Sequence, residues 1–191
     1  MALRKIATIG HPILRERARE IGREELLGAP MQRLIDDLIE TMRDAQGAGL
    51  AANQVHEPVR LCVVEIHKNQ RYPYKPDWPL TILCNPSVDA ITDETFMNFE
   101  GCLSVPNLRG QVPRFTRVRV RGWNRIGHEL DFEVKGLTAG TFQHELDHLD
   151  GKLFVDRVTD TRTLCTWADY DRFYRDDFVA RANALVLRFG S

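Results

Sequence analysis

The side chains of residues 143–148, the motif QHELDH, could bind and use a metal ion. His144 and His148 are four residues apart, so in a helix their rings lie one above the other on the same face. That face would offer two nitrogen ligands to a divalent ion, with Glu145 beside the first ligand to move a proton. Metal-dependent hydrolases use this pattern. Because it fixes only three identities, a half-exposed helix with two structural histidines is the alternative.

The neighbouring residues predict that this stretch is a buried helix. Thr138 or Thr141 can cap its start, and Gly151 stands where a left-handed residue would end it. Leucines recur at helical spacing beside the histidines: Leu146, Leu149 and Leu153. We therefore expect the rest of the domain to hold this helix rigidly at its centre.

A third ligand is needed, because a catalytic site of this type has three protein ligands and one open position. No histidine follows His148 and no glutamate follows Glu145. The third ligand is then either a downstream aspartate, such as Asp150 or Asp156, or a residue from upstream. Cys102 is the strongest upstream candidate, since a thiolate binds softer divalent metals well. The weaker candidates are the scattered histidines His11, His56, His67 and His128.

Composition describes an ordinary globular chain of 191 residues, the size of one domain with a proper core. The net charge of −1 gives no reason to expect DNA or an anionic membrane as partner. No apolar run approaches the ~20 residues of a membrane span, and the N-terminus does not resemble a secretory signal. The four cysteines are far apart, and Cys62 and Cys84 lie in apolar runs. We expect a reducing compartment, the bacterial cytoplasm or an organelle.

The periodicity of the apolar residues predicts a single α+β catalytic domain over residues 1–191, with antiparallel or mixed sheets packed around the metal-binding helix. An apolar stripe predicts a helix over residues 31–45, ended by Gly47. The amphipathic tail predicts one long C-terminal helix over residues 163–188, packed on the body. Strands are predicted at residues 60–66, 80–84, 92–99, 117–123 and 129–134, the last two as a hairpin.

The segment GAGLAANQ at residues 47–54 joins the first long helix to the first strand. Its glycines let a ligand or another backbone approach closely. The segment lacks the lysine and hydroxyl residues of a phosphate-binding loop. It is therefore either a substrate contact or a tight connection without chemistry.

Three motifs together resemble those of the peptide deformylases. They are GAGLAANQ at residues 47–54, EGCLS at 100–104 and QHELDH at 143–148, in the order that this family has them. The segment HPILR at residues 11–15 is similar to the family's N-terminal segment, so the resemblance extends from about residue 6 to residue 157. Ala48 departs from the family, in which a branched apolar residue is common. The tail from residue 163 resembles, less specifically, members with an extended helix.

The resemblance implies a metal-dependent hydrolase that removes the N-formyl group from the formylmethionine of newly made polypeptides and releases formate. Its partners would be N-formylmethionyl peptides, including nascent chains at the ribosome. One divalent ion would be held by Cys102, His144 and His148. Iron(II) is the metal expected in the cell, with zinc, nickel or cobalt able to occupy the site.

Each residue of the mechanism then has an expected role. Glu145 would take a proton from the attacking water and deliver it to the leaving nitrogen. The side-chain amide of Gln54 and the backbone N–H of Leu103 would stabilise the charge that develops on the formyl oxygen. We also expect an apolar methionine pocket near Phe142.

The glycine segment would bind an extended peptide as an added strand, through Gly47, Ala48 and Gly49. The resemblance adds Arg109 as a contact for the far end of the peptide, and a solvated surface arginine is the alternative. Two rival functions remain. One is a metalloprotease with a downstream aspartate ligand and an inert Cys102, and the other is a non-catalytic binding module.

Overall fold

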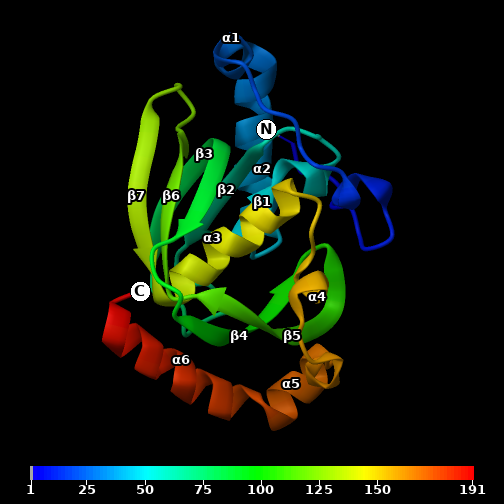
Figure 1. Ribbon diagram of the computed structural model, residues 1–191. Coiled ribbons are helices and arrows are strands. Elements are labelled where there is room, and N and C mark those ends of the chain that lie inside the picture. Colours follow the sequence, from blue (N-terminus) through cyan, green and yellow to red (C-terminus); the bar gives the residue numbers. More distant parts are fainter. Residues whose placement is uncertain (1) are drawn as a thin grey trace.

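The computed structural model describes residues 2–191, and its regular elements are helices and antiparallel strands (Figure 1). The helices are α1 (Arg23–Leu27), α2 (Ala29–Asp44), α3 (Gly136–Leu149), α4 (Phe154–Arg157), α5 (Trp167–Phe173) and α6 (Arg175–Phe189). The strands are β1 (Gly49–Ala51), β2 (Leu61–Ile66), β3 (Trp78–Ala90), β4 (Thr95–Cys102), β5 (Val105–Phe115), β6 (Arg117–Trp123) and β7 (Glu129–Lys135). This arrangement confirms the predicted α+β class.

The helix α3 lies at the centre of the molecule, with a sheet on either side (Figure 1). A five-stranded antiparallel sheet has the order β1-β2-β3-β6-β7, and β4 pairs with β5 in a separate hairpin. Every residue of α3 except His144 is buried. The central metal-binding helix is therefore enclosed on all sides apart from the one at which His144 reaches the surface.

Strand β2 packs against a helix on each face. Its residues Leu61 and Val63 belong to the core shared with α2, whereas Cys62 and Val64 belong to the core shared with α3. Because both faces are covered, the first four residues of β2 are all apolar and do not alternate with polar ones. Strand β1 pairs with β2 and therefore also lies against α3, where its Gly49 meets Glu145.

The hairpin β4–β5 is longer than the sequence predicts. The expected strand ended at residue 99, but β4 runs on to Cys102, and β5 was not expected at all. Strand β5 contains Pro106, Gly110 and Pro113, residues that argue against a strand in the middle of a sheet. A two-stranded sheet tolerates them because each of its strands has a free edge.

The C-terminal segment is two helices, and the predicted single helix over residues 163–188 is wrong in this respect. The chain leaves the helical conformation at Tyr174, where φ is −123° and ψ is −19°. The bend lets Tyr170 and Phe178 both pack on Phe99, at ring-centroid distances of 5.1 Å and 5.8 Å. The long C-terminal helix α6 is present and packs on the body, as Figure 1 shows.

Two predicted helix ends are also wrong. Helix α3 begins at Gly136 and not at a capping threonine, because Gly136 has a φ of +56° and turns strand β7 directly into the helix. Its neighbour Leu137 donates its backbone N–H to the Ser191 carbonyl. The chain leaves α2 through Gln46, with a φ of +53°, rather than through Gly47. The predicted C-terminal residue Gly151 has the expected left-handed conformation.

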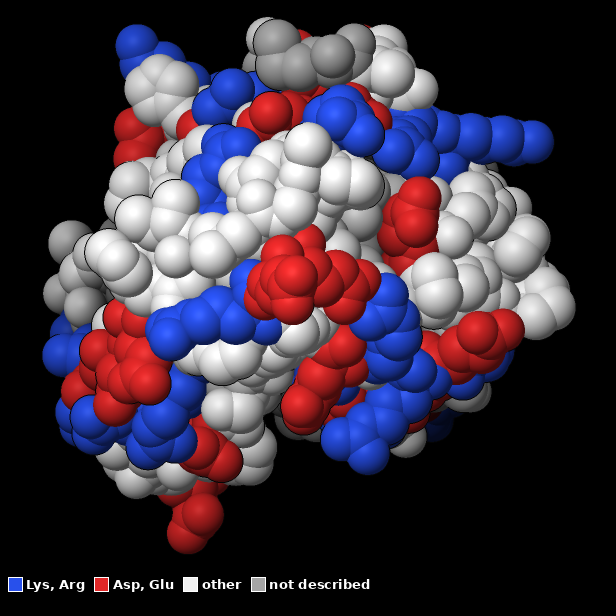
Figure 2. Space-filling view, turned by 90° about the horizontal axis from the view of Figure 1, so that it is seen from above, with Lys and Arg blue, Asp and Glu red and all other residues white. Residues whose placement is uncertain are grey.

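The surface carries both signs of charge. Figure 2 shows Lys and Arg interspersed with Asp and Glu on the face seen from above, with neither sign alone covering it. All four cysteines are free, and Cys62 and Cys84 are buried as predicted. Among residues 2–191, no helix has both the length and the apolar character that crossing a membrane requires.

Candidate metal centre

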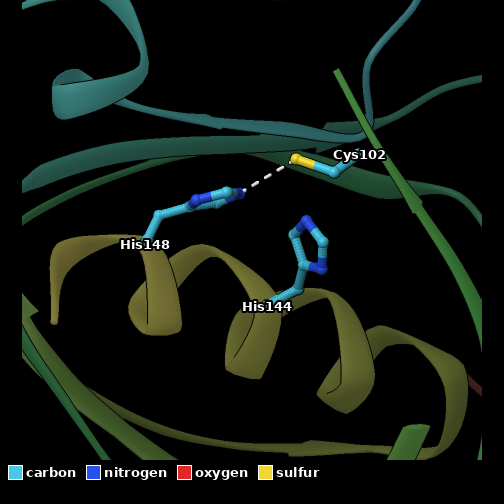
Figure 3. A group of neighbouring side chains, drawn as sticks. All are labelled: Cys102, His144 and His148. Carbon is cyan, nitrogen blue, oxygen red and sulfur yellow. Dashed lines mark hydrogen bonds between the residues drawn. The ribbon is translucent and has the colours of Figure 1, made fainter. Parts of the chain in front are cut away.

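Three side chains from two segments meet above the C-terminal half of α3. His144 and His148 rise from neighbouring turns of the helix toward Cys102, at the end of β4 (Figure 3). One donor atom from each of them lies within 4.8 Å of the other two. The Sγ atom of Cys102 is 3.2 Å from Nε2 of His148. One thiolate and two imidazoles at this spacing fit an ion such as zinc or iron(II).

Electrostatics favours the thiolate form of Cys102. Burial alone would raise the pKa of this thiol, but His148 and His144 hold it well below its usual range. The backbone N–H of Ser104 donates to the sulfur at 3.3 Å. A deprotonated thiol is the form that binds a metal.

A buried ion-pair network orients His144. Its Nδ1 atom lies 2.8 Å from Oε2 of Glu100, which leaves Nε2 for the metal side. Glu100 receives two hydrogen bonds from Arg114, and Arg114 also donates to Asp147 on α3. These contacts join β4, β5 and α3, and the carboxylate fixes the orientation of the ring. In the sequence, Glu100 and Asp147 stand out only as members of motifs, and Arg114 lies outside every motif.

His148 is held through its backbone. Asn53 donates its side-chain amide to the His148 carbonyl at 2.5 Å, which connects the glycine segment to the helix. Both predicted aspartate alternatives are engaged elsewhere. Asp150 pairs with Arg60, and Asp156 pairs with Arg15.

Glu145 points into the same space and is buried. Burial raises the pKa of its carboxyl group, and its Oε2 atom has no hydrogen-bond partner among the described residues. Gly49 lies directly against this carboxylate, because a Cβ atom at position 49 would be only 2.5 Å from Glu145 Oε1. The glycine is therefore required by Glu145, a reason that the sequence did not reveal.

Gln54 is fixed by hydrogen bonds at both ends of its amide. Its Oε1 atom accepts from the Ala51 N–H at 2.9 Å, and its Nε2 atom donates to Ser104 Oγ at 3.0 Å. The same Nε2 is 3.5 Å from Cys102 Sγ. The amide donor thus lies beside the proposed ligands. Ser104, which sequence analysis did not single out, supports it.

One cleft connects these groups. Its walls include eight of the predicted site residues: Gly47, Ala48, Gly49, Gln54, Cys102, Leu103, His144 and Glu145. Its walls also include polar and cationic side chains, Arg71, Lys75, Asn98 and Thr141, together with the rings of Tyr72 and Phe99. Phe142, near which an apolar pocket is predicted, points into the core and packs on Trp78 and Phe132, whereas Gly140 and Thr141 on the same helix line the cleft.

Arg109 is absent from the walls of this cleft. Its side chain is fully buried, so the alternative interpretation of Arg109 as a solvated surface residue is wrong. Its guanidinium lies 3.8 Å from the ring centroid of Tyr170 and donates to the Phe99 carbonyl at 2.5 Å. A direct peptide contact by Arg109 is not supported by this position. We assign the residue to the packing of α5 on the hairpin.

Comparison with known proteins identifies the family. A sequence profile of the polypeptide deformylases matches residues 3–163. The chain belongs to the peptide deformylase family. It is 45% identical to peptide deformylase 1 of Bordetella pertussis over 130 residues, which are 68% of this chain and 74% of that one. It is 40% identical to peptide deformylase 2 of Nostoc sp. over 165 residues, 86% and 91% of the two chains.

A solved deformylase has the same fold. The class I type b peptide deformylase of Acinetobacter baumannii, with Met-Ala-Ser bound, superposes with a TM-score of 0.79 at 35% identity. The match covers 82% of this chain and 99% of that structure. Membership of the deformylase family explains the order of the three motifs, and the fold explains how they meet around one cleft.

Proposed function

We propose that this hydrolase removes the formyl group from the N-terminal formylmethionine of newly made polypeptides and releases formate. The observation that carries the proposal is the convergence of Cys102, His144 and His148 beside a buried, unpartnered Glu145. The bacterial deformylases to which the chain is similar support the same reaction. We propose nascent chains in the bacterial cytoplasm as the substrates in the cell.

The three ligands would hold one divalent ion, for which we propose iron(II) in the cell. When bound, such an ion supplies a Lewis acid and lowers the pKa of a water from 15.7 to about 7. Glu145 accepts a proton as water attacks the formyl carbon and delivers it to the leaving nitrogen. Burial suits this role, because a raised pKa makes the carboxylate a stronger base.

Two donors serve the formyl oxygen, which gains negative charge as its carbon becomes tetrahedral. The Gln54 amide is held by Ala51 and Ser104, so little reorganisation is needed when the charge develops. The backbone N–H of Leu103 is the second donor, and Leu103 lines the cleft next to the ligand Cys102. A single donor of this kind accounts for about 3 kcal/mol of barrier.

The peptide would lie along β1 as an added strand. β1 ends the five-stranded sheet, so only one of its edges is paired, with β2. Gly47, Ala48 and Gly49 line the cleft at this end of the sheet. Main-chain hydrogen bonds to this edge would hold the substrate whatever its sequence.

The test is a formate assay on protein purified without oxygen and loaded in turn with iron(II), nickel, cobalt and zinc. Formyl-Met-Ala-Ser should give equal amounts of formate and of the free amino terminus. Glu145→Gln should lower the rate by ~10²–10⁴-fold and leave the metal content unchanged. Absence of formate with every metal would rule out this function.

A further inference from the structure

The cleft beside the ligands contains a lysine whose role the proposed reaction does not explain. Lys75 lies between β2 and β3, and its Nζ atom donates to Thr141 Oγ1 at 2.8 Å. Thr141 stands one turn before Glu145 on α3. The ammonium group is therefore held about one helical turn from the proposed proton carrier, in the part of the cleft beyond the ligands.

The geometry around Lys75 leaves part of its donor capacity free. An ammonium group has three N–H donors, and Thr141 takes one of them. The Thr141 hydroxyl donates its own proton to the Leu137 carbonyl, so it acts only as acceptor toward Lys75. The ring of Tyr72 lies 4.8 Å from Nζ and covers another side. The remaining donor can serve a ligand in the cleft.

The acids around Lys75 do not neutralise it. Glu100 is already paired with Arg114 and bound to His144. Among the described residues 2–191, neither Lys75 nor Arg71, which also lines the cleft, has a carboxylate within 4.0 Å, the distance of an ion pair. Desolvation lowers the pKa of Lys75 to about 8, against the opposing effects of Glu100 and Glu145. A half-buried cation without an acidic partner in the protein favours the binding of a ligand that carries an anionic group.

The adjoining wall combines small residues with further polar groups. Gly140 and Ala48 contribute little side-chain volume, and Asn98 adds an amide to the same wall. Arg71 stands at the cleft too, with its guanidinium over the Trp167 ring. Apolar side chains line the cleft as well, among them Tyr72, Phe99 and Leu103, so the cleft offers cationic and polar groups beside apolar contacts.

We propose that this part of the cleft receives the first side chain of the substrate and binds a carboxylate at its end through Lys75. This inference rests on the proposed deformylation and adds an acidic first side chain to those that the enzyme accepts. A formylated peptide that begins with glutamate is then hydrolysed at least as efficiently as one that begins with methionine. The substrate class then includes N-formyl peptides with an acidic first residue beside the formylmethionyl peptides.

The experiment compares kcat/KM for formyl-Glu-Ala-Ser and formyl-Met-Ala-Ser, using the metal-loaded enzyme. We expect a Glu/Met ratio of one or more for the natural chain. Lys75→Met should lower that ratio at least tenfold, whereas Lys75→Arg should keep it within a few-fold of the original. Lys5→Met, which removes an exposed lysine, should leave the ratio unchanged.

Three outcomes overturn the inference: a ratio below one for the natural chain, a ratio that Lys75→Met does not change, or a ratio that Lys5→Met lowers equally. The first is measured without any variant, so a misfolded Lys75→Met cannot hide the answer. A chain that hydrolyses only the methionine peptide refutes the acidic preference and keeps the proposed function. A chain that hydrolyses neither peptide refutes the proposed function itself.

Discussion

Gly49 and Glu145 form a contact that has consequences for catalysis. The carboxylate fills the space that a side chain at position 49 would need. A residue of any other type would displace either β1 or the carboxylate. In the proposed mechanism Glu145 reaches both the attacking water and the leaving nitrogen, so a small displacement should change the rate strongly.

Gly49→Ala should therefore lower kcat for formate release by about 10²-fold, the usual cost of a displacement near 1 Å. Metal content should stay at the natural level, because the atoms nearest to the new methyl group belong to Glu145 and not to a ligand. Gly22→Ala is the matched control, since a Cβ atom there meets nothing within 4 Å. A Gly49→Ala enzyme with unchanged kcat would show that the close approach does not matter.

Among the elements, the hairpin β4–β5 and the helix α3 depend on each other through Glu100, Arg114 and Asp147. Arg114 is almost fully buried and holds one carboxylate from each side. Removing one partner of such a network leaves a buried charge without compensation. The orientation of His144 depends on one of these two carboxylates, that of Glu100.

Glu100→Gln should weaken metal binding by about 10–100-fold, the usual loss when a residue that orients a metal-bound histidine is changed. Competition with a chelator of known affinity measures this. Glu65→Gln changes a carboxylate on β2, away from the ligands, and should not alter metal affinity. Equal affinities for Glu100→Gln and the natural chain would contradict the orienting role.

The packing of α6 on the hairpin depends on Phe178, which is 1% exposed and contacts Phe99, Tyr170 and Tyr74. Phe178→Ala should lower the free energy of unfolding by about 3–5 kcal/mol, because it opens a cavity in this cluster. Leu187→Ala, at a position 88% exposed, should change it by less than about 0.5 kcal/mol. Urea denaturation measures both, and similar losses for the two variants would contradict the packing.

The sequence predicts those helices and strands that are determined by the pattern of residues within the segment itself. Helix α2 and the strands β2, β6 and β7 follow from periodicity. Strand β5 was missed because its prolines and glycine are tolerated only at free edges, which the sequence does not reveal. The break at Tyr174 was missed because it depends on how two helices pack on Phe99, a contact between distant segments.

Charge is balanced over the whole molecule, with 26 basic and 27 acidic residues. Many of these charges are paired between elements, as Arg43 of α2 is with Glu65 of β2 at 2.6 Å. The hydrogen bond from Arg43 lowers the pKa of Glu65. The stabilisation is therefore fully present above the unfolded-state value of about 4.3 and is lost as the pH falls through the lower folded-state pKa.

Arg43→Met should destabilise the protein at pH 7 by about 0.2–1 kcal/mol, the range of partly exposed ion pairs. The difference between this variant and the natural chain should shrink as the pH falls below about 4. Comparing the two chains cancels the acid sensitivity of the metal ligands. A difference that grows on acidification would contradict the sign of the Glu65 shift.

At the scale of the whole fold, the sequence predicted which motifs meet but not what surrounds them. Three motifs in order were enough to place Cys102, Gln54 and Glu145 beside the two histidines. The cationic side chains Lys75 and Arg71 in the cleft were not predictable. Lys75 comes from an irregular segment and reaches the cleft only through the packing of the sheet on α3. The burial of Arg109 by α5 was not predictable either, because nothing in the sequence indicates that contact.

The central claim is that Cys102 joins His144 and His148 around one ion. X-ray absorption at the metal edge, on protein purified without oxygen, tests it most directly. We predict one metal ion per chain with one sulfur and two imidazole nitrogens as protein ligands, and loss of the sulfur contribution in Cys102→Ala. A metal bound in the natural chain without sulfur, or the same spectrum in the variant, would contradict the account.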